Sequence, residues 1–250
     1  MPFDDVTSAT DGRRHFATTH WSIVRSAGHQ STPDAAAALE TLCQAYWFPL
    51  YAFVRQQGHR EAEAQDLTQA FFVTLLERDD LRHLTPQKGR FRSFLLASLK
   101  HFLLNEWDRR KAQKRGGGRM ILSLDFATAE SRLNVELIDR VTPQSVFERQ
   151  WAVTLLDRVR THLREEFMAS NRTEQFDVLY IYLTGDSSGL SYAEAAERLN
   201  MTEAAVKMAV HRLRRRFHDA IRREIAQTVA TQEDVDDEIH TLMAAFQRPV

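Results

Sequence analysis

Two clusters of positive charge are the groups in this chain that could do chemistry, and that chemistry is the binding of an anion. Between Lys88 and Arg119 there are ten Lys or Arg residues against two acids. Between Glu203 and Arg223 there are seven, again against two acids. The whole chain of 250 residues has a formal net charge of -1. Two basic clusters in a nearly neutral chain indicate a polyanion that is contacted at two places.

Catalytic chemistry has little support in the sequence. We find no phosphate-binding glycine loop, no His-Glu-x-x-His motif and no Cys/His set of metal-ligand spacing. His59 lies near Glu61, Glu63 and Asp66, which suggests a metal site. These residues do not share one helical face, however, and acids are common where helices begin. We therefore expect no metal, no cofactor and no enzymatic activity.

The sequence also bears on the compartment. Cys43 is the only cysteine, so the chain cannot form an internal disulfide. The first residues include acids and lack the apolar segment of a signal peptide. No apolar run approaches the roughly 18 residues of a membrane span. We expect a cytoplasmic protein with no membrane contact.

The elements that position the basic clusters are predicted to be helices. Apolar residues recur at helical spacing along most of the chain, alternating runs are nearly absent, and there are only 9 glycines. The glycine run at 116–118 ends any helix and indicates a flexible joint. We therefore predict an all-α fold with two helical domains. The parts are a disordered N-terminus (1–19), a helical domain (20–115), a flexible linker (116–144), a second helical domain (145–225) and an acidic amphipathic tail (226–250).

The second basic cluster lies in a pair of short helical patterns. Ser191 can cap the first helix and Thr202 the second, while Asn200 between them tolerates a left-handed turn. The two patterns therefore predict a helix-turn-helix whose second helix enters the major groove of DNA. We predict contacts to the DNA from Thr202, Glu203, Ala204, Lys207, Met208, His211, Arg212, Arg214 and Arg215. An alanine-rich helical hairpin with a solvated basic face is the alternative.

The first basic cluster mixes cations with aromatic residues. At helical spacing most of these aromatics, from Phe91 to Trp107, must belong to the core. Aromatic rings beside cations also suit unpaired bases, because stacking and phosphate attraction act together. We predict contacts to single-stranded DNA from Lys100, His101, Asn105, Arg109, Arg110, Lys114 and Arg115. A duplex reader and a single-strand reader in one chain favour a protein that melts promoters.

Two blocks of the sequence resemble one family. The string LSYAEAAERLNMTEAAVKMAVHRLRRRF is similar to the reader of the upstream promoter element in extracytoplasmic-function (ECF) sigma factors of bacterial RNA polymerase. EAEAQDLTQAFFVTLLE, followed by GRFRSFLLASLKHFLLNEWDRRKAQKR, resembles the domain of these factors that binds polymerase and melts the promoter. The resemblance covers about residues 20–225. Its second block is similar to a subset of such factors from bacteria rich in Ser/Thr kinases.

The resemblance implies a sigma factor that directs transcription initiation. The first domain, which is sigma region 2-like, would bind the clamp of core RNA polymerase through Glu63, Asp66 and Gln69 and would trap melted promoter DNA. The second domain, which is region 4-like, would bind the upstream promoter element. An anti-sigma factor is a further partner that such proteins can have. The main alternative is a helix-turn-helix regulator that does not replace the sigma factor.

Departures from the family pattern suggest two forms of regulation. Gln65 and Ala70 stand where the family often has acids, so we expect weaker polymerase docking. Phosphorylation of Thr68 by a Ser/Thr kinase would add about 1.5 to 2 negative charges to this helix. Ala209 replaces a frequent Arg in the recognition helix and removes one expected DNA contact. The acidic tail could cover the basic DNA helix, although such tails more often pack on their own domain.

Overall fold

The protein is all-helical in the part of the chain that the structure describes. The structure is a computed structural model that describes residues 33–77, 85, 89–112, 124, 126, 129–133, 142–184 and 190–247. Its helices are α2 (Pro33–Gln56), α3 (Glu61–Glu77), α4 (Phe91–Ala112), α5 (Ala129–Leu133), α6 (Pro143–Ala169), α7 (Thr173–Tyr180), α8 (Tyr192–Arg198), α9 (Glu203–Ala226) and α10 (Gln232–Gln247). The predicted all-α fold is confirmed.

The N-terminal half is built from α2, α3 and α4, which bury aromatic side chains against one another. Tyr51, Phe53 and Phe91 are almost completely buried. The rings of Tyr46 and Phe91 meet edge to face, with their centroids 5.4 Å apart. Gly58 ends the α2 segment at a φ of 92°, a conformation that favours glycine because it has no Cβ.

The C-terminal half is organised along α6, which α7 and α9 cover. Thr142 caps α6 by accepting a hydrogen bond from the backbone N–H of Ser145, and Pro143 begins the helix. Phe147, Leu163 and Phe167 of α6 are buried. Phe167 also packs on Phe176 of α7, at 5.4 Å between ring centroids.

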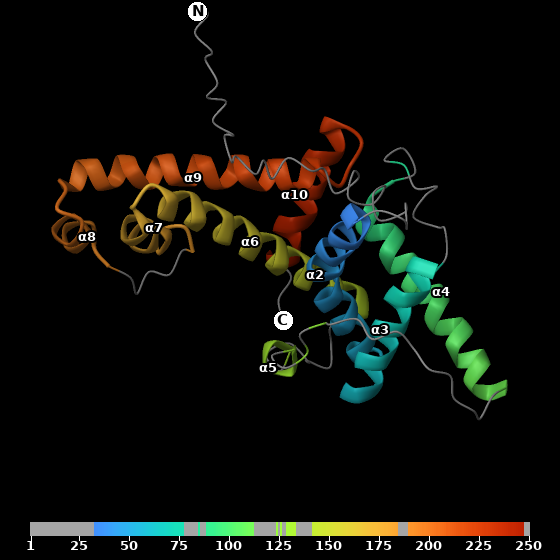
Figure 1. Cartoon of the computed structure of the whole chain (residues 1–250). Helices are drawn as coiled ribbons and strands as arrows, with labels where there is room; N and C mark the ends of the chain where they lie inside the picture. Colours follow the sequence, from blue (N-terminus) through green and yellow to red (C-terminus); the bar gives the residue numbers. More distant parts are fainter. Residues whose placement is uncertain are drawn as a thin grey trace, which may run out of the picture.

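The two halves share one hydrophobic core, because α2 lies along α6. Trp151 of α6 is buried in this core, and the guanidinium of Arg92, in α4, lies 4.7 Å from the centre of its ring. In Figure 1, α8 and the start of α9 lie at one end of the molecule, whereas α3 and α4 lie at the other. The two predicted DNA-binding faces are therefore far apart.

A short helix anchors part of the segment that we predict to be a linker. Ala129 and Leu133 of α5 are buried, and Glu130 between them pairs with Arg55 of α2. The two oxygens of Glu130 accept hydrogen bonds from Nε and Nη2 of Arg55 at 2.7 and 2.8 Å, and Tyr51 donates another. The hydrogen bond from Arg55 lowers the pKa of Glu130. The domain boundaries themselves stay a prediction.

The tail that we predict to be acidic and amphipathic contains a helix, α10, of 16 residues. The helix turns back from the end of α9 and packs on α6 and α9 (Figure 1). Val235 and Leu242 are buried on its inner side, whereas Met243 and Phe246 are largely exposed.

Candidate nucleic-acid interface

The helix-turn-helix is set up by two caps and one turn residue, as the sequence predicts. Ser191 accepts a hydrogen bond from the backbone N–H of Glu194, whose carboxylate accepts one from the N–H of Ser191. These hydrogen bonds lower the pKa of Glu194. Thr202 caps α9 by accepting from the N–H of Ala205 at 3.2 Å. Asn200 has a φ of 50°, so the predicted left-handed turn is present.

The face of α9 that we predict to meet DNA is fully accessible. Val206, Val210 and Leu213 are buried against the rest of the C-terminal half and fix the orientation of the helix. The opposite face consists of the predicted contacts, all of them exposed: Thr202, Glu203, Ala204, Lys207, Met208, His211, Arg212, Arg214 and Arg215. The side chains that we assigned to DNA from the sequence are therefore gathered on one surface.

The expectation about Ala209 is wrong. Ala209 is 6% exposed and faces the core together with Val206 and Val210. A long cation at this position would have to enter the core, so the alanine does not remove a contact from the exposed face.

A pair of stacked tyrosines supports the exposed face of α9. The rings of Tyr182 and Tyr192 are 4.7 Å apart and nearly parallel, at 7°. The hydroxyl of Tyr182 donates to the carbonyl of Leu190 at 2.7 Å. Lys207 places its ammonium 5.3 Å from the centre of the Tyr192 ring, and Arg214 donates to the carbonyl of Tyr182 at 2.9 Å. These contacts hold two of the predicted DNA-binding cations, and sequence spacing did not indicate them.

The second predicted DNA face, on α4, is described only in part. Lys100, His101 and Asn105 are exposed. Lys100 lies 3.4 Å from the side-chain oxygen of Gln144 at the start of α6. The side chains of Arg109 and Arg110 and the whole of Lys114 and Arg115 lie outside the described residues. The structure therefore describes the side chains of only the first three residues of this predicted face, Lys100, His101 and Asn105.

Exposed apolar side chains lie beside these α4 residues. Leu104 is 62% exposed and Trp107 is 60% exposed. We expected most aromatic residues of this helix to be core, and Phe91 and Phe102 are buried. Trp107 differs because it follows Leu104 by three residues and Lys100 by seven, a spacing that places it on the outer face.

The start of α4 carries an ion pair that helical spacing does not indicate. Arg92 is buried, and its Nε donates to Glu238 of α10 at 2.6 Å. Arg90 reaches the other oxygen of Glu238 at 2.8 Å. Two cations of the first basic cluster are therefore paired with a carboxylate of the tail, which could not be foreseen because 146 residues separate Arg92 from Glu238.

The face of α3 that we predict to bind polymerase contains exposed and half-buried side chains. Asp66 is exposed, whereas Glu63 and Gln69 are half-buried. The ring Nδ1 of His59 is 3.2 Å from a carboxylate oxygen of Glu63. Thr68 is fully buried, and its hydroxyl donates to the carbonyl of Ala64 at 2.7 Å. Thr68 is the predicted phosphorylation site, and its burial hides the hydroxyl from solvent.

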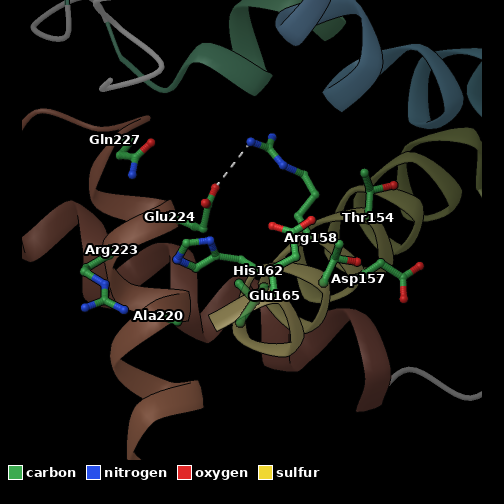
Figure 2. Close-up of a pocket in the computed structure, with 11 residues that line it drawn as sticks. Thr154, Asp157, Arg158, His162, Glu165, Ala220, Arg223, Glu224 and Gln227 are labelled. Carbon is green, nitrogen blue, oxygen red and sulfur yellow. Dashed lines mark ion pairs between the residues drawn. The ribbon is translucent and has the colours of Figure 1, made fainter. Parts of the chain in front are cut away.

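A cavity of about 460 Å³ lies between α6 and α9 (Figure 2). Its lining mixes acids and bases, with Arg158 and Glu224 3.7 Å apart, and includes His162.

Across the described residues, no group of three His, Cys, Asp or Glu side chains could hold a metal ion. His59 and its acidic neighbours are included in that statement. Within the same residues, no helix has the length and apolar character of a membrane span.

Together these features define a helical DNA-binding protein with a helix-turn-helix reader. The sequence model of a family described as ECF sigma factor matches residues 29–223 of the chain. The protein belongs to this family, and its role is that of a sigma factor in transcription initiation. No curated protein and no solved structure matches the chain. The resemblance seen in the sequence is thereby confirmed at the level of the family.

Proposed function

We propose that the two ends of this sigma factor divide the work of promoter recognition. The face of α9 binds the duplex of the upstream promoter element, with Lys207 and His211 at base edges or nearby phosphates and the arginines mainly on phosphates. The exposed part of α4, with His101 and Asn105, contacts bases of the melted element. Glu63, Asp66 and Gln69 of α3 contact the clamp of core RNA polymerase.

One observation carries this proposal. All nine predicted upstream contacts are exposed on one side of a capped helix-turn-helix, and the apolar residues between them are buried. A solvated helical hairpin would usually mix both signs on its outer face, whereas this face has four Lys or Arg residues against one acid, which suits a helix that lies in the major groove. The family match extends over both ends of the molecule and supports a role for each.

Promoter-directed transcription tests the proposal. Purified protein is combined with core RNA polymerase and a library of templates that carry random upstream and start-site sequences, and the transcripts are sequenced. We expect transcripts that share two sequence elements. Lys207→Ala together with His211→Ala should remove the dependence on the upstream element, because these two residues are the ones that we assign to base edges. The proposal is wrong if the complete protein yields no specific transcript with the core enzyme.

A helix-turn-helix regulator is the second candidate function, favoured by the fully exposed face of α9 alone. Such a regulator would bind the same duplex but would need another sigma factor for transcription. Adding the host's principal sigma factor to the reaction distinguishes the two. Transcripts that appear only after this addition would identify a regulator.

Phosphorylation by a Ser/Thr kinase at Thr68 is the finer part of the proposal. The α3 face has few acids, so a phosphate would raise its attraction to a basic clamp surface. Because Thr68 is buried here, a kinase can reach the hydroxyl only after its surroundings are rearranged. Thr68→Ala and Thr68→Glu are compared in a pull-down with core polymerase, with thermal unfolding as the control for folding. Equal binding by two folded variants would exclude the switch.

An anti-sigma factor is a further partner that we propose, and it is sought by a pull-down with the wild-type chain from a lysate of the host.

A further inference from the structure

Three successive acids of α10 connect the two DNA-binding ends of the molecule. Asp236 pairs with Arg222 of α9 at 2.7 Å, Asp237 lies 3.3 Å from Arg90, and Glu238 pairs with both Arg90 and Arg92. We call Asp236, Asp237 and Glu238 the acidic clasp. It ties the helix that carries the upstream reader to the helix that carries the melted-strand face.

The centre of the clasp is a buried set of charges. Glu238 is 1% exposed; both of its oxygens contact Arg92, and one of them also contacts Arg90. Arg92 donates to it from Nε at 2.6 Å and from Nη2 at 3.1 Å, and its guanidinium lies over the ring of Trp151. Removing charges from water is costly, and apolar residues of similar volume often stabilise a fold as well or better. The stability of the fold is therefore a weak reason for burying these charges. A change between a paired and a released state of α10 is a better one.

The chemistry of the two arginines fits a second ligand. A guanidinium pair at the beginning of a helix suits any oxyanion, because guanidinium binds carboxylate and phosphate with the same fork of donors. The positive end of the α4 dipole adds to this attraction. Arg90 and Arg92 precede Lys100 and His101 on the helix that we assign to melted DNA. A phosphate of a single strand could therefore replace the carboxylate of Glu238.

We propose that Arg90 and Arg92 form an additional phosphate-binding site for single-stranded promoter DNA, and that the acidic clasp of α10 covers this site in the free protein. This inference rests on the proposed function of α4. Single-stranded DNA and the clasp then compete for the same two cations. The clasp lowers the affinity of the free protein for stray single strands, and release of α10 exposes the site.

Binding of the full-length chain to a fluorescein-labelled single-stranded oligonucleotide of mixed sequence tests the proposal. The affinity is measured by anisotropy at several salt concentrations. Glu238→Gln should bind about tenfold more tightly, and the slope of log K against log [salt] should become steeper by about 1.4, since each additional phosphate contact contributes about 0.7 for single strands. Glu233→Gln, which removes an exposed acid from the first turn of the same helix, should retain the wild-type slope.

Two further variants control for folding and for the identity of the cations that bind the phosphate. Asp237→Asn alters a side chain that is 71% exposed, so it preserves the fold and should give a smaller gain in the same direction. Arg90→Gln with Arg92→Gln in the Glu238→Gln background should return the slope to its wild-type value. Unchanged slopes in both Glu238→Gln and Asp237→Asn would overturn the proposal. If Glu238→Gln fails to fold, the result for Asp237→Asn decides.

The outcome can be separated from that of the proposed function. A chain that gives promoter-directed RNA but shows no change of slope on removing Glu238 has the function without the covered site. A steeper slope for Glu238→Gln, in a chain that gives no RNA with core polymerase, means that the covered site exists in a protein with another role.

Discussion

The two basic faces of this protein differ in what holds them. The face of α9 is supported from below by apolar residues such as Val210 and Leu213 and by caps at Ser191 and Thr202, and it is open to solvent. The basic face of α4 begins with two arginines that are tied to Glu238, and its Lys100 contacts Gln144. The face of α9 that we propose to bind duplex is thus open in the free chain, whereas two arginines at the start of the proposed single-strand face are already paired with a carboxylate.

The largest expected effect comes from removing charge from the open face. Arg212→Ala together with Arg215→Ala should weaken binding to any duplex about 100-fold, because each charged hydrogen bond contributes about 1.5 kcal/mol. The salt dependence of duplex binding should fall by about two phosphate contacts. Anisotropy with a labelled duplex measures both quantities. Arg223→Ala, which removes an exposed cation near the end of the same helix, is the control. An equal loss of duplex affinity in this variant would mean that the binding does not depend on where the cation lies along α9.

A smaller effect is expected on the α4 face. His101→Ala with Asn105→Ala should weaken binding to a single strand about tenfold, because a base stacked on the ring of His101 contributes about 1 to 3 kcal/mol. Binding to duplex should not change, so the two faces would be separated by their ligands. Ser93→Ala, at an exposed position of the same helix, serves as the control. Loss of duplex binding in the double variant would contradict the division between the two ends.

The turn that sets the open face can be tested by conformation alone. Asn200 has a φ of 50°, so Asn200→Val should destabilise the fold by about 1 kcal/mol, whereas Asn200→Gly should be tolerated. For a chain of this size the valine variant should unfold about 2 to 4 °C lower. Thermal unfolding by circular dichroism measures the difference. Equal midpoints for the two variants would show that the turn does not constrain the reader.

The smallest effect concerns the response to acid of the ion pair that anchors α5 on α2. The pKa of Glu130 is lowered from its usual 4.5 by hydrogen bonding to Arg55, so this pair stabilises the fold above about pH 4.5 and the contribution is lost as the pH falls below it. Glu130→Gln should therefore lower stability at pH 7 and flatten its loss on acidification. Urea unfolding between pH 7 and pH 3 measures this change. Parallel pH profiles for the variant and the wild type would contradict the assignment.

Local features of the fold could be predicted from the sequence because their causes are local. The caps at Ser191 and Thr202, the left-handed Asn200 and the apolar spacing of α9 lie within a few residues of the structure that they specify. The exposure of the predicted upstream contacts follows from the same spacing. Helical spacing alone was therefore enough to predict which residues of α9 are exposed.

Features that join distant segments could not be predicted in this way. The pairing of Arg92 with Glu238 and the anchoring of Glu130 on α2 depend on how the helices pack, which periodicity does not reveal. Thr68 and Ala209 are different, because local spacing accounts for their burial. Thr68 follows buried Ala64 by four residues and Ala209 follows buried Val206 by three, so each shares the inner face of its helix. The expectations for these two residues rested on charge and on the family pattern instead of on this spacing.

The stacked tyrosines beneath α9 affect how the recognition helix meets its target. A free lysine explores many rotamers, and ordering such a side chain at an interface costs about 0.5 to 1.5 kcal/mol. Lys207 already lies over the ring of Tyr192 in the unbound chain, so its range of motion is restricted during folding. In the proposed complex with DNA, this contact would reduce the rotamer freedom that Lys207 has left to lose on binding, so the aromatic support would favour association.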